Sequence, residues 1–120
     1  SASTNQSNVD DVHHDADTTY NSSSTVNHRD SFQMGAIPAS TGTVAAIQHR
    51  LVARKDDAGV KTLAPFQRQS STDYVGTGQN LTTAYVHYRE IVETNPDTAV
   101  AYTVAEMQAT SPEFGYKVTA

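Results

Sequence analysis

The sequence predicts an all-β protein, an antiparallel, jelly-roll-like β-sandwich of about eight strands with one short helix near the C-terminus. Stretches in which apolar and polar side chains alternate recur at intervals of roughly 8–12 residues, separated by clusters of Gly, Asp, Asn and Ser. The hydrophobic fraction of 37% is low, and Ser, Thr, Asn and Gln replace the missing apolar residues rather than charged ones. This composition favours a solvated, β-rich domain over a disordered acidic chain.

The N-terminal residues are expected to lie outside the fold. Residues 1–8 are polar and show no apolar periodicity, which is typical of a flexible polar arm. Residues 9–120 are expected to form a single β-sandwich domain, because the chain has the length of one ordinary domain and contains no linker. Between residues 9 and 38, isolated apolar residues separated by turn formers predict short strands rather than a helix.

Two long strands are predicted next. Residues 43–55 alternate with a two-residue period, and one of the two faces is half polar, so that it should meet solvent or a neighbour. Residues 60–68 alternate in the same way, and Pro65 places this strand at a sheet edge or beside a bulge. The intervening Asp56-Asp57-Ala58-Gly59 predicts a four-residue hairpin loop, because the acids can bond their own backbone and Gly59 can take a positive φ at no steric cost.

The charge cluster Lys55-Asp56-Asp57 invites a chemical interpretation, as a metal site or an acid–base pair. Adjacent carboxylates on a strand point in opposite directions, and no further ligand is spaced nearby. The cluster is therefore interpreted as a polar turn.

The C-terminal half predicts two further strands. Residues 71–81 form a short strand ended by Gly76 and Gly78, and residues 82–93 form a long one rich in Tyr and β-branched residues. Because Ile91 falls on the face opposite Val86 and Tyr88, a bulge near residues 89–90 is expected.

The helix is predicted at Val104–Ala109. Thr103 stands at the N-cap position and Glu106 at the capping-box position, and Ser111-Pro112 ends the helix. A terminal strand follows at residues 113–119, where aromatic and β-branched residues alternate with polar ones.

Charge and composition exclude several classes of partner. The net charge is -5, and residues 1–30 hold five acids against one arginine, so they alone contribute -4. A chain without a basic stripe lacks the electrostatic footprint of nucleic-acid binding, so no nucleic acid is expected as a partner. The absence of cysteine excludes disulfides, thiolate nucleophiles and Cys-ligated zinc. No apolar run of bilayer-spanning length and no signal segment occur, so no membrane partner is expected.

One acidic stretch combines residue types that bind divalent ions. Imidazole and carboxylate groups fall within five residues, at His13, His14, Asp15 and Asp17. Neighbouring histidines of an extended segment project to opposite sides, so a closed site would need another histidine (His28, His49 or His87) or a second subunit. A calcium loop that also uses Asp10 and Asp11 lacks regular ligand spacing. These residues are weak metal candidates, and the favoured interpretation is a solvated loop with no cofactor.

No catalytic residue is predicted. The serines and histidines occur without a nucleophile elbow or other activating context, and the "GTGQNL" stretch lacks the third glycine and the helix that a phosphate cradle requires. The six tyrosines are expected mainly in the core, and a tyrosine platform that stacks sugars is the alternative.

Several short segments together resemble a family of small structural proteins of tailed bacteriophages. The resemblance extends over residues 9–119, and it is carried by Ala53–Gly59 (ARKDDAG), Thr72–Tyr74 (TDY), Thr82–Tyr85 (TTAY), Glu93–Thr98 (ETNPDT), Thr103–Met107 (TVAEM) and Glu113–Val118 (EFGYKV). The chain departs from the family pattern at Tyr102, where tryptophan is common, and at Pro112, which precedes the last strand.

The resemblance implies a non-enzymatic virion component, as a capsid decoration or spike, collar or tail-fibre-associated protein. Such a protein acts by assembling with other virion proteins and with copies of itself as a homo-oligomer, in a virion put together in the host cytoplasm. The alternative is a carbohydrate- or receptor-binding β-sandwich module that contacts a host surface glycan. A third possibility, a small hydrolase, would need a pocket where a histidine and a carboxylate meet.

Overall fold

The computed structural model describes residues 15–18, 20–33, 42–108 and 112–120. Its elements are β1 (Arg29–Gln33), β2 (Ile47–Ala53), β3 (Thr62–Gln69), β4 (Thr72–Val75), β5 (Gln79–Asn80), β6 (Val86–Val92), α2 (Val104–Gln108) and β7 (Glu113–Val118). The predicted all-β class is confirmed, and the predicted arm at residues 1–8 lies outside the described residues. No helix of the described residues is long and apolar enough to cross a membrane.

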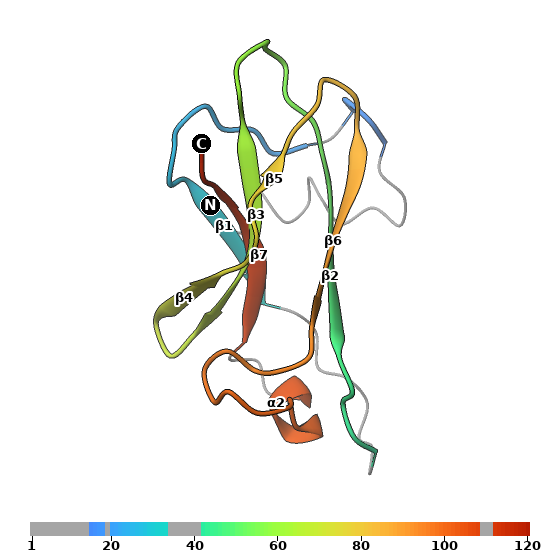
Figure 1. Cartoon of the computed structure of the whole chain (residues 1–120), viewed down its shortest axis with the longest axis vertical. Coiled ribbons are helices and arrows are strands. Elements are labelled where there is room, and N and C mark those ends of the chain that lie inside the picture. The colour runs from blue at the N-terminus through green and yellow to red at the C-terminus, as the bar shows by residue number, and fades with distance from the viewer. Residues whose placement is uncertain (1–14, 19, 34–41, 109–111) are drawn as a thin grey trace.

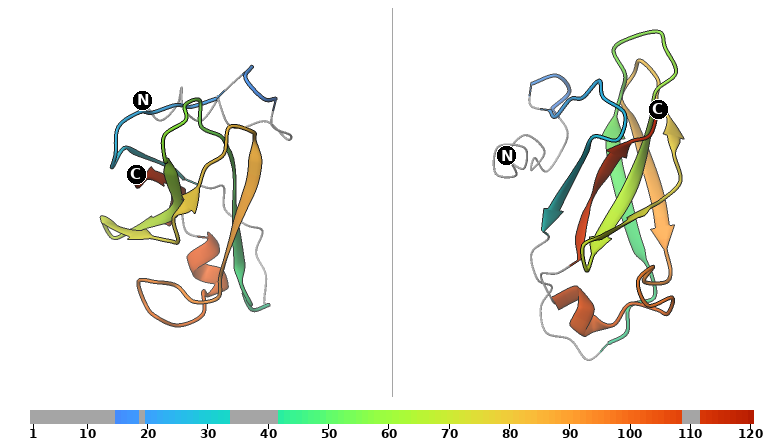
Figure 2. Two further views of the ribbon diagram at one scale, coloured as in Figure 1. Left: turned by 45° about the horizontal axis from the view of Figure 1, so that its top comes forward. Right: turned by 90° about the vertical axis from the view of Figure 1, so that its left-hand side faces the viewer.

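The strands form two antiparallel sheets that face each other in a β-sandwich-like arrangement (Figures 1 and 2). The five-stranded sheet has the order β1-β7-β3-β4, with β5 also paired to β3, and the two-stranded sheet consists of β2 and β6. The ring of His49 on β2 meets the ring of Phe114 on β7 edge-on, with 6.0 Å between centroids. The loop after β6 and helix α2 lie at the lower end of the molecule in Figure 1. The jelly-roll connectivity stays a prediction.

The predicted hairpin between the two long strands is wrong. β2 pairs with β6, whereas β3 pairs with β7, β4 and β5, so the connection at residues 54–61 crosses from one sheet to the other (Figure 1). Side-chain alternation identifies a strand and its faces, but it does not identify the strand's partner. We call residues 54–61 the arch. Gly59 could take a positive φ without steric cost, but neither it nor any other described glycine does so.

The proline of β3 predicted either an edge position or a bulge, and the edge position is wrong because β3 is a central strand. The pairing is irregular beside Pro65, where three residues between Val75 and Gln79 face two residues between Leu63 and Phe66. β7 lies on one side of β3, and the other side is shared by β5, which pairs with Thr62 and Leu63, and by β4, whose pairing starts at Phe66. The carbonyl of Pro65 accepts a hydrogen bond from the Gly76 amide at 2.8 Å, so the proline nitrogen points to the side where β5 gives way to β4. At this break the missing N–H costs little ladder pairing.

The predicted bulge on β6 is wrong as well. β2 and β6 pair through seven consecutive residue pairs, from Ile47 opposite Val92 to Ala53 opposite Val86. Ile91 lies on the outer face of this sheet and is 64% exposed. The expected bulge rested on the assumption that Ile91 must be buried, and an exposed isoleucine removes the need for it.

The five-stranded sheet is strongly curled. Arg29 of β1 and Asp73 of β4 form an ion pair with 2.7 Å between Nε and Oδ2, although β7 and β3 lie between these strands in the sheet. Arg68 of β3 contacts the same carboxylate. Two strands this far apart in the sheet order can meet only if the sheet bends until its edges approach, which encloses Phe66, 1% exposed, on the same face of β3 as Arg68.

The buried core is small. Among the described residues, the buried hydrophobic side chains are Ala64, Phe66 and Tyr102. Three polar side chains are buried with them, namely Gln67, Gln69 and Asn95. The prediction that most tyrosines pack in the core is therefore fulfilled only by Tyr102, which is 3% exposed.

The predicted helix cap is confirmed. The amide of Glu106 donates to Oγ1 of Thr103 at 3.1 Å, and the amide of Thr103 donates to Oε1 of Glu106 at 3.2 Å, which together form a capping box. Helix α2 extends over Val104–Gln108, and the predicted last residue, Ala109, lies outside the described residues. The predicted terminal strand is β7, and it lies between β1 and β3.

Candidate functional site

Two of the four weak metal candidates, Asp15 and Asp17, belong to the described residues, and Asp17 forms an ion pair with Arg54. Asp17 Oδ1 accepts hydrogen bonds from Nη2 of Arg54 at 3.0 Å and from the hydroxyl of Tyr85 at 2.7 Å. The Arg54 guanidinium lies 5.3 Å from the centroid of the Tyr85 ring, within the range of a cation–π contact. We call Asp17, Arg54 and Tyr85 the N-terminal clamp.

The clamp favours the ionised form of Asp17. The hydrogen bond from Tyr85 and, next, that from Arg54 lower the pKa of the Asp17 carboxyl. His13 and His14 lie outside the described residues, and Asp15 takes part in an interaction of its own. Within the described ranges no group of three or more His, Asp or Glu side chains could hold a metal ion. The interpretation of residues 13–17 as a weak metal candidate stays a prediction, and the clamp shows that Asp17 ties the N-terminal segment to the arch.

The charge cluster of the arch is built from local contacts. The amide of Gly59 donates to Oδ1 of Asp57 at 2.9 Å, Nζ of Lys55 donates to the Gly59 carbonyl at 2.6 Å, and Lys61 pairs with Asp57 at 3.7 Å. The acidic side chain thus bonds the backbone two residues on, as the sequence predicts for a turn. These contacts support the structural interpretation of the cluster, in an arch rather than a hairpin.

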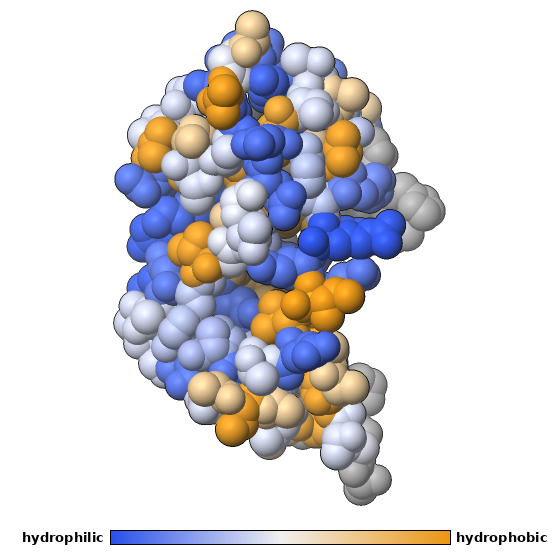
Figure 3. Space-filling model, viewed as in Figure 1, coloured by the Kyte–Doolittle hydropathy of each residue, from blue (hydrophilic) through white to orange (hydrophobic). Residues whose placement is uncertain are grey.

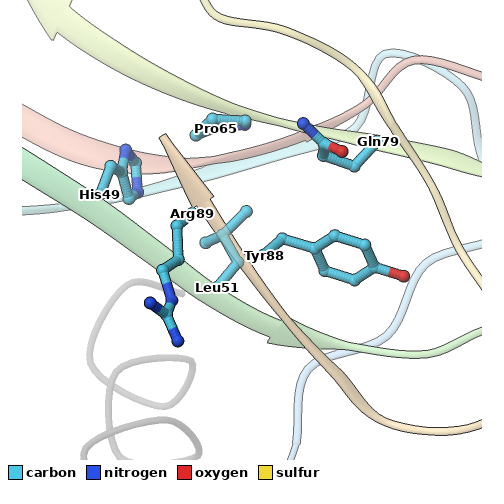
Figure 4. Close-up of a pocket in the computed structure, with 6 residues that line it drawn as sticks. All are labelled: His49, Leu51, Pro65, Gln79, Tyr88 and Arg89. Carbon is cyan, nitrogen blue, oxygen red and sulfur yellow. The ribbon is translucent and has the colours of Figure 1, made fainter. Parts of the chain in front are cut away.

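A narrow crevice lies between the sheets. It is lined by His49, Leu51, Pro65, Gln79, Tyr88 and Arg89, and it has no room for a water molecule (Figure 4). Burial lowers the pKa of His49, while the charge of Glu90 opposite it on β6 acts in the other direction. Oε1 of Glu90 accepts the amide of Thr77 at 3.1 Å, so this carboxylate ties the two sheets together. A small hydrolase would need a pocket in which a histidine and a carboxylate meet. His49 and Glu90 do lie opposite each other here, but in a packed interface.

The buried polar side chains form one network under the loop before α2. Nε2 of Gln69 donates to Oδ1 of Asn95 at 2.9 Å, and the hydroxyl of Tyr102 donates to Oε1 of Gln67. Nδ2 of Asn95 donates to Glu106, the capping-box residue of α2. Burial raises the pKa of Tyr102 to about 12, so its hydroxyl keeps its proton at neutral pH. The network fastens the loop and α2 to β3.

Most tyrosine hydroxyls form hydrogen bonds within the molecule. Tyr74 donates to Asp97 at 2.7 Å, Tyr88 donates to the carbonyl of Asn80 at 3.2 Å, and Tyr116 accepts a hydrogen bond from Asn21 at 2.8 Å. Tyr20 is the one tyrosine counted among the exposed large hydrophobic residues of the described chain, at 53% exposure. An array of exposed tyrosines, as a sugar-stacking platform requires, is not found within these residues.

The outer face of the two-stranded sheet carries two arginines that face each other across the strands. The register places Arg50 of β2 directly opposite Arg89 of β6, and both are exposed. The other arginines, Arg29, Arg54 and Arg68, each pair with an aspartate, whereas these two take part in none of the ion pairs of the described residues. The sequence predicts that this face of β2 meets solvent or a neighbour, but the arginine pair becomes visible only once β6 is known to be the partner.

Comparisons of the chain with protein-family models, with curated proteins and with solved structures found no match.

Proposed function

We propose that this protein is a non-enzymatic structural subunit that acts by assembling with copies of itself and with other proteins, as a component of a bacteriophage virion. The observation that carries the assembly part is the small core, with three buried hydrophobic side chains in the described residues of a 120-residue chain. Burial of apolar surface is the dominant stabilising term in folding, and a partner that binds the folded state adds to stability.

The virion part of the proposal rests on the sequence resemblance. Its segments coincide with connections and local contacts that hold the fold together. ARKDDAG covers the end of β2 and much of the arch, ETNPDT supplies Asn95 of the buried network, and TVAEM supplies the capping box. In these segments, side-chain hydrogen bonds build a turn, the buried network and the helix cap, which supports a structural role for them.

Labelling of particles tests the virion proposal directly. An antibody raised against the chain and coupled to gold is applied to purified virus particles from cultures that produce the protein. The expected result is label at regular positions on the particles. Label confined to host debris or to the soluble fraction would contradict the proposal.

A further inference from the structure

We infer that the outer face of the two-stranded sheet is a docking site for an acidic polypeptide segment, and that the segment is residues 9–17 of a second copy of this chain. The face consists of Gln48, Arg50, Val52, His87, Arg89 and Ile91. The inference rests on the proposed function, because it names the contact through which copies assemble.

The arginine pair is the first argument. Like charges directly opposite each other on neighbouring strands destabilise a sheet. Arg50 and Arg89 occupy such a pair, and the paired residues of β2 and β6 place no carboxylate on their face, because Glu90 points to the other sheet. Figure 4 shows Arg89 pointing away from Pro65 and Gln79 of the opposite sheet. An arrangement that weakens the isolated chain is explained if a bound carboxylate neutralises both arginines.

The apolar residues of the face are the second argument. Ile91 is 64% exposed, and Val52 lies on the same face, so each arginine has an apolar neighbour two residues away on its own strand. At the right of Figure 3, strongly hydrophilic side chains project beside hydrophobic ones over the β2–β6 sheet. A surface of this kind binds a segment in which acidic and apolar side chains are interspersed.

Charge complementarity identifies the segment. Residues 9–17, VDDVHHDAD, contain four aspartates, two valines and no lysine or arginine, in a chain whose first 30 residues carry -4 of the net charge of -5. Asp17 is held in the clamp of its own copy, so Asp10 and Asp11 match the arginine pair, and Val9 and Val12 match the apolar residues beside it. Nucleic acid fits the face less well, because two arginines on an acidic chain neutralise few phosphates.

Peptide binding to the full chain tests the inference. The probe is a fluorescent peptide of residues 8–17, NVDDVHHDAD, and its partner peptide has all four aspartates replaced by asparagine. In fluorescence anisotropy at low salt, the aspartate peptide should bind and the asparagine peptide should bind at least tenfold more weakly. Equal binding of both peptides, or no binding of the aspartate peptide, would overturn the inference.

Charge variants locate the site. Arg89→Glu should weaken binding of the aspartate peptide at least tenfold, and Lys117→Glu, which makes the same charge change on β7 of the other sheet, should leave it within twofold. Arg50→Lys with Arg89→Lys should weaken binding several-fold, because lysine keeps the charge but loses the two-pronged geometry that suits a carboxylate. If Lys117→Glu weakens binding as much as Arg89→Glu, the face is not the site.

Two controls belong to the same experiment: one checks that the variant is still folded, and the other checks that the bound partner is an acidic polypeptide. Arg89→Glu replaces a repulsive pair with an attractive one, so its urea midpoint should not fall, and lost binding cannot then be assigned to unfolding. A duplex DNA or a heparin fragment that competes better than the aspartate peptide would overturn the assignment to an acidic polypeptide. If the peptide fails to bind while the wild-type chain still self-associates, this inference falls and the proposed function stands.

Discussion

Gly115 lies where the backbone of β1 passes close to β7. A Cβ added there would lie 1.8 Å from the carbonyl oxygen of Asp30 and 2.7 Å from Cα of Ser31, both backbone atoms of β1. Gly115 also lies opposite Phe66 in the register of β3 and β7. The curled sheet therefore depends on this glycine, for reasons of space and not of φ, since its φ is not positive.

Gly115→Ala should destabilise the protein by about 3 kcal/mol, the upper part of the range for overpacking, because backbone atoms have to move. Gly78→Ala is the matched control, since its Cβ would meet only Oγ1 of Thr119 at 3.5 Å. Urea unfolding followed by circular dichroism measures both. Equal midpoints for the two variants would contradict the close approach of β1 and β7.

Ser70 and Ser71 form the two-residue turn between β3 and β4, with φ values of 50° and 65°. Positive φ at both positions is the mark of a type I′ turn, for which Asn-Gly is the preferred pair. Left-handed backbone costs an L-residue other than Gly, Asn or Asp roughly 1–2 kcal/mol. The turn was missed by sequence analysis because two serines do not carry its usual composition.

Ser70→Asn combined with Ser71→Gly should raise the free energy of unfolding by about 1 kcal/mol, since both residues suit left-handed backbone. Ser24→Gly serves as the control, because Ser24 is exposed and has no positive φ. That control should be neutral or slightly destabilising. Thermal unfolding that shows no gain for the double variant would argue against the turn type.

His49 makes stability depend on pH. Burial lowers its pKa in the folded state from the ordinary value of 6.5, so below pH 6.5 the unfolded chain binds a proton that the folded chain does not. The stability contributed at this position is therefore present above pH 6.5 and is lost as the pH falls through that value toward the folded pKa.

Comparison with His49→Gln isolates this effect. The difference in free energy of unfolding between the wild-type chain and the variant should shrink as the pH is lowered from about 7.5 to 5.5, because only the wild type loses the contribution. Urea titrations at a series of pH values measure it. A difference that stays constant or grows would show that His49 remains free to take up a proton in the folded state.

At the scale of elements, most strands and the helix cap could be predicted from the sequence, whereas the partners of the strands could not. The two-residue period located β2, β3, β6 and β7, and Thr103 with Glu106 located α2. The arch was taken for a hairpin because Asp56–Gly59 has turn chemistry that serves either connection. The buried network of Gln67, Gln69 and Asn95 could not be predicted, since these residue types are normally exposed.

The loop and α2 are held to β3 through Tyr102. Tyr102→Phe should lower the free energy of unfolding by about 1–3 kcal/mol, because it leaves the buried Oε1 of Gln67 without its hydroxyl donor. Tyr20→Phe is the matched control, because Tyr20 is 53% exposed and should tolerate the change. Chemical denaturation measures both, and a neutral Tyr102→Phe would mean that the hydrogen bond from the Tyr102 hydroxyl contributes nothing to stability.

At the scale of the whole molecule, composition predicted the all-β class, and the small core agrees with the low hydrophobic fraction of 37%. The arginine pair on the outer face could not be predicted, because it depends on the pairing of two strands separated by more than thirty residues. Arg50 and Arg89 lie directly opposite each other, unlike the arginines that pair with aspartates, and like charges placed in this way weaken a sheet. This contrast connects the architecture to the proposed assembly.

Multi-angle light scattering of the wild-type chain over a concentration series tests the assembly proposal most directly. If the chain assembles with copies of itself, the measured mass should rise from the 12.9 kDa of one chain to a discrete multiple, and Arg50→Glu with Arg89→Glu should reduce that rise. A mass that stays at 12.9 kDa up to the highest concentration reached would contradict the proposed self-assembly.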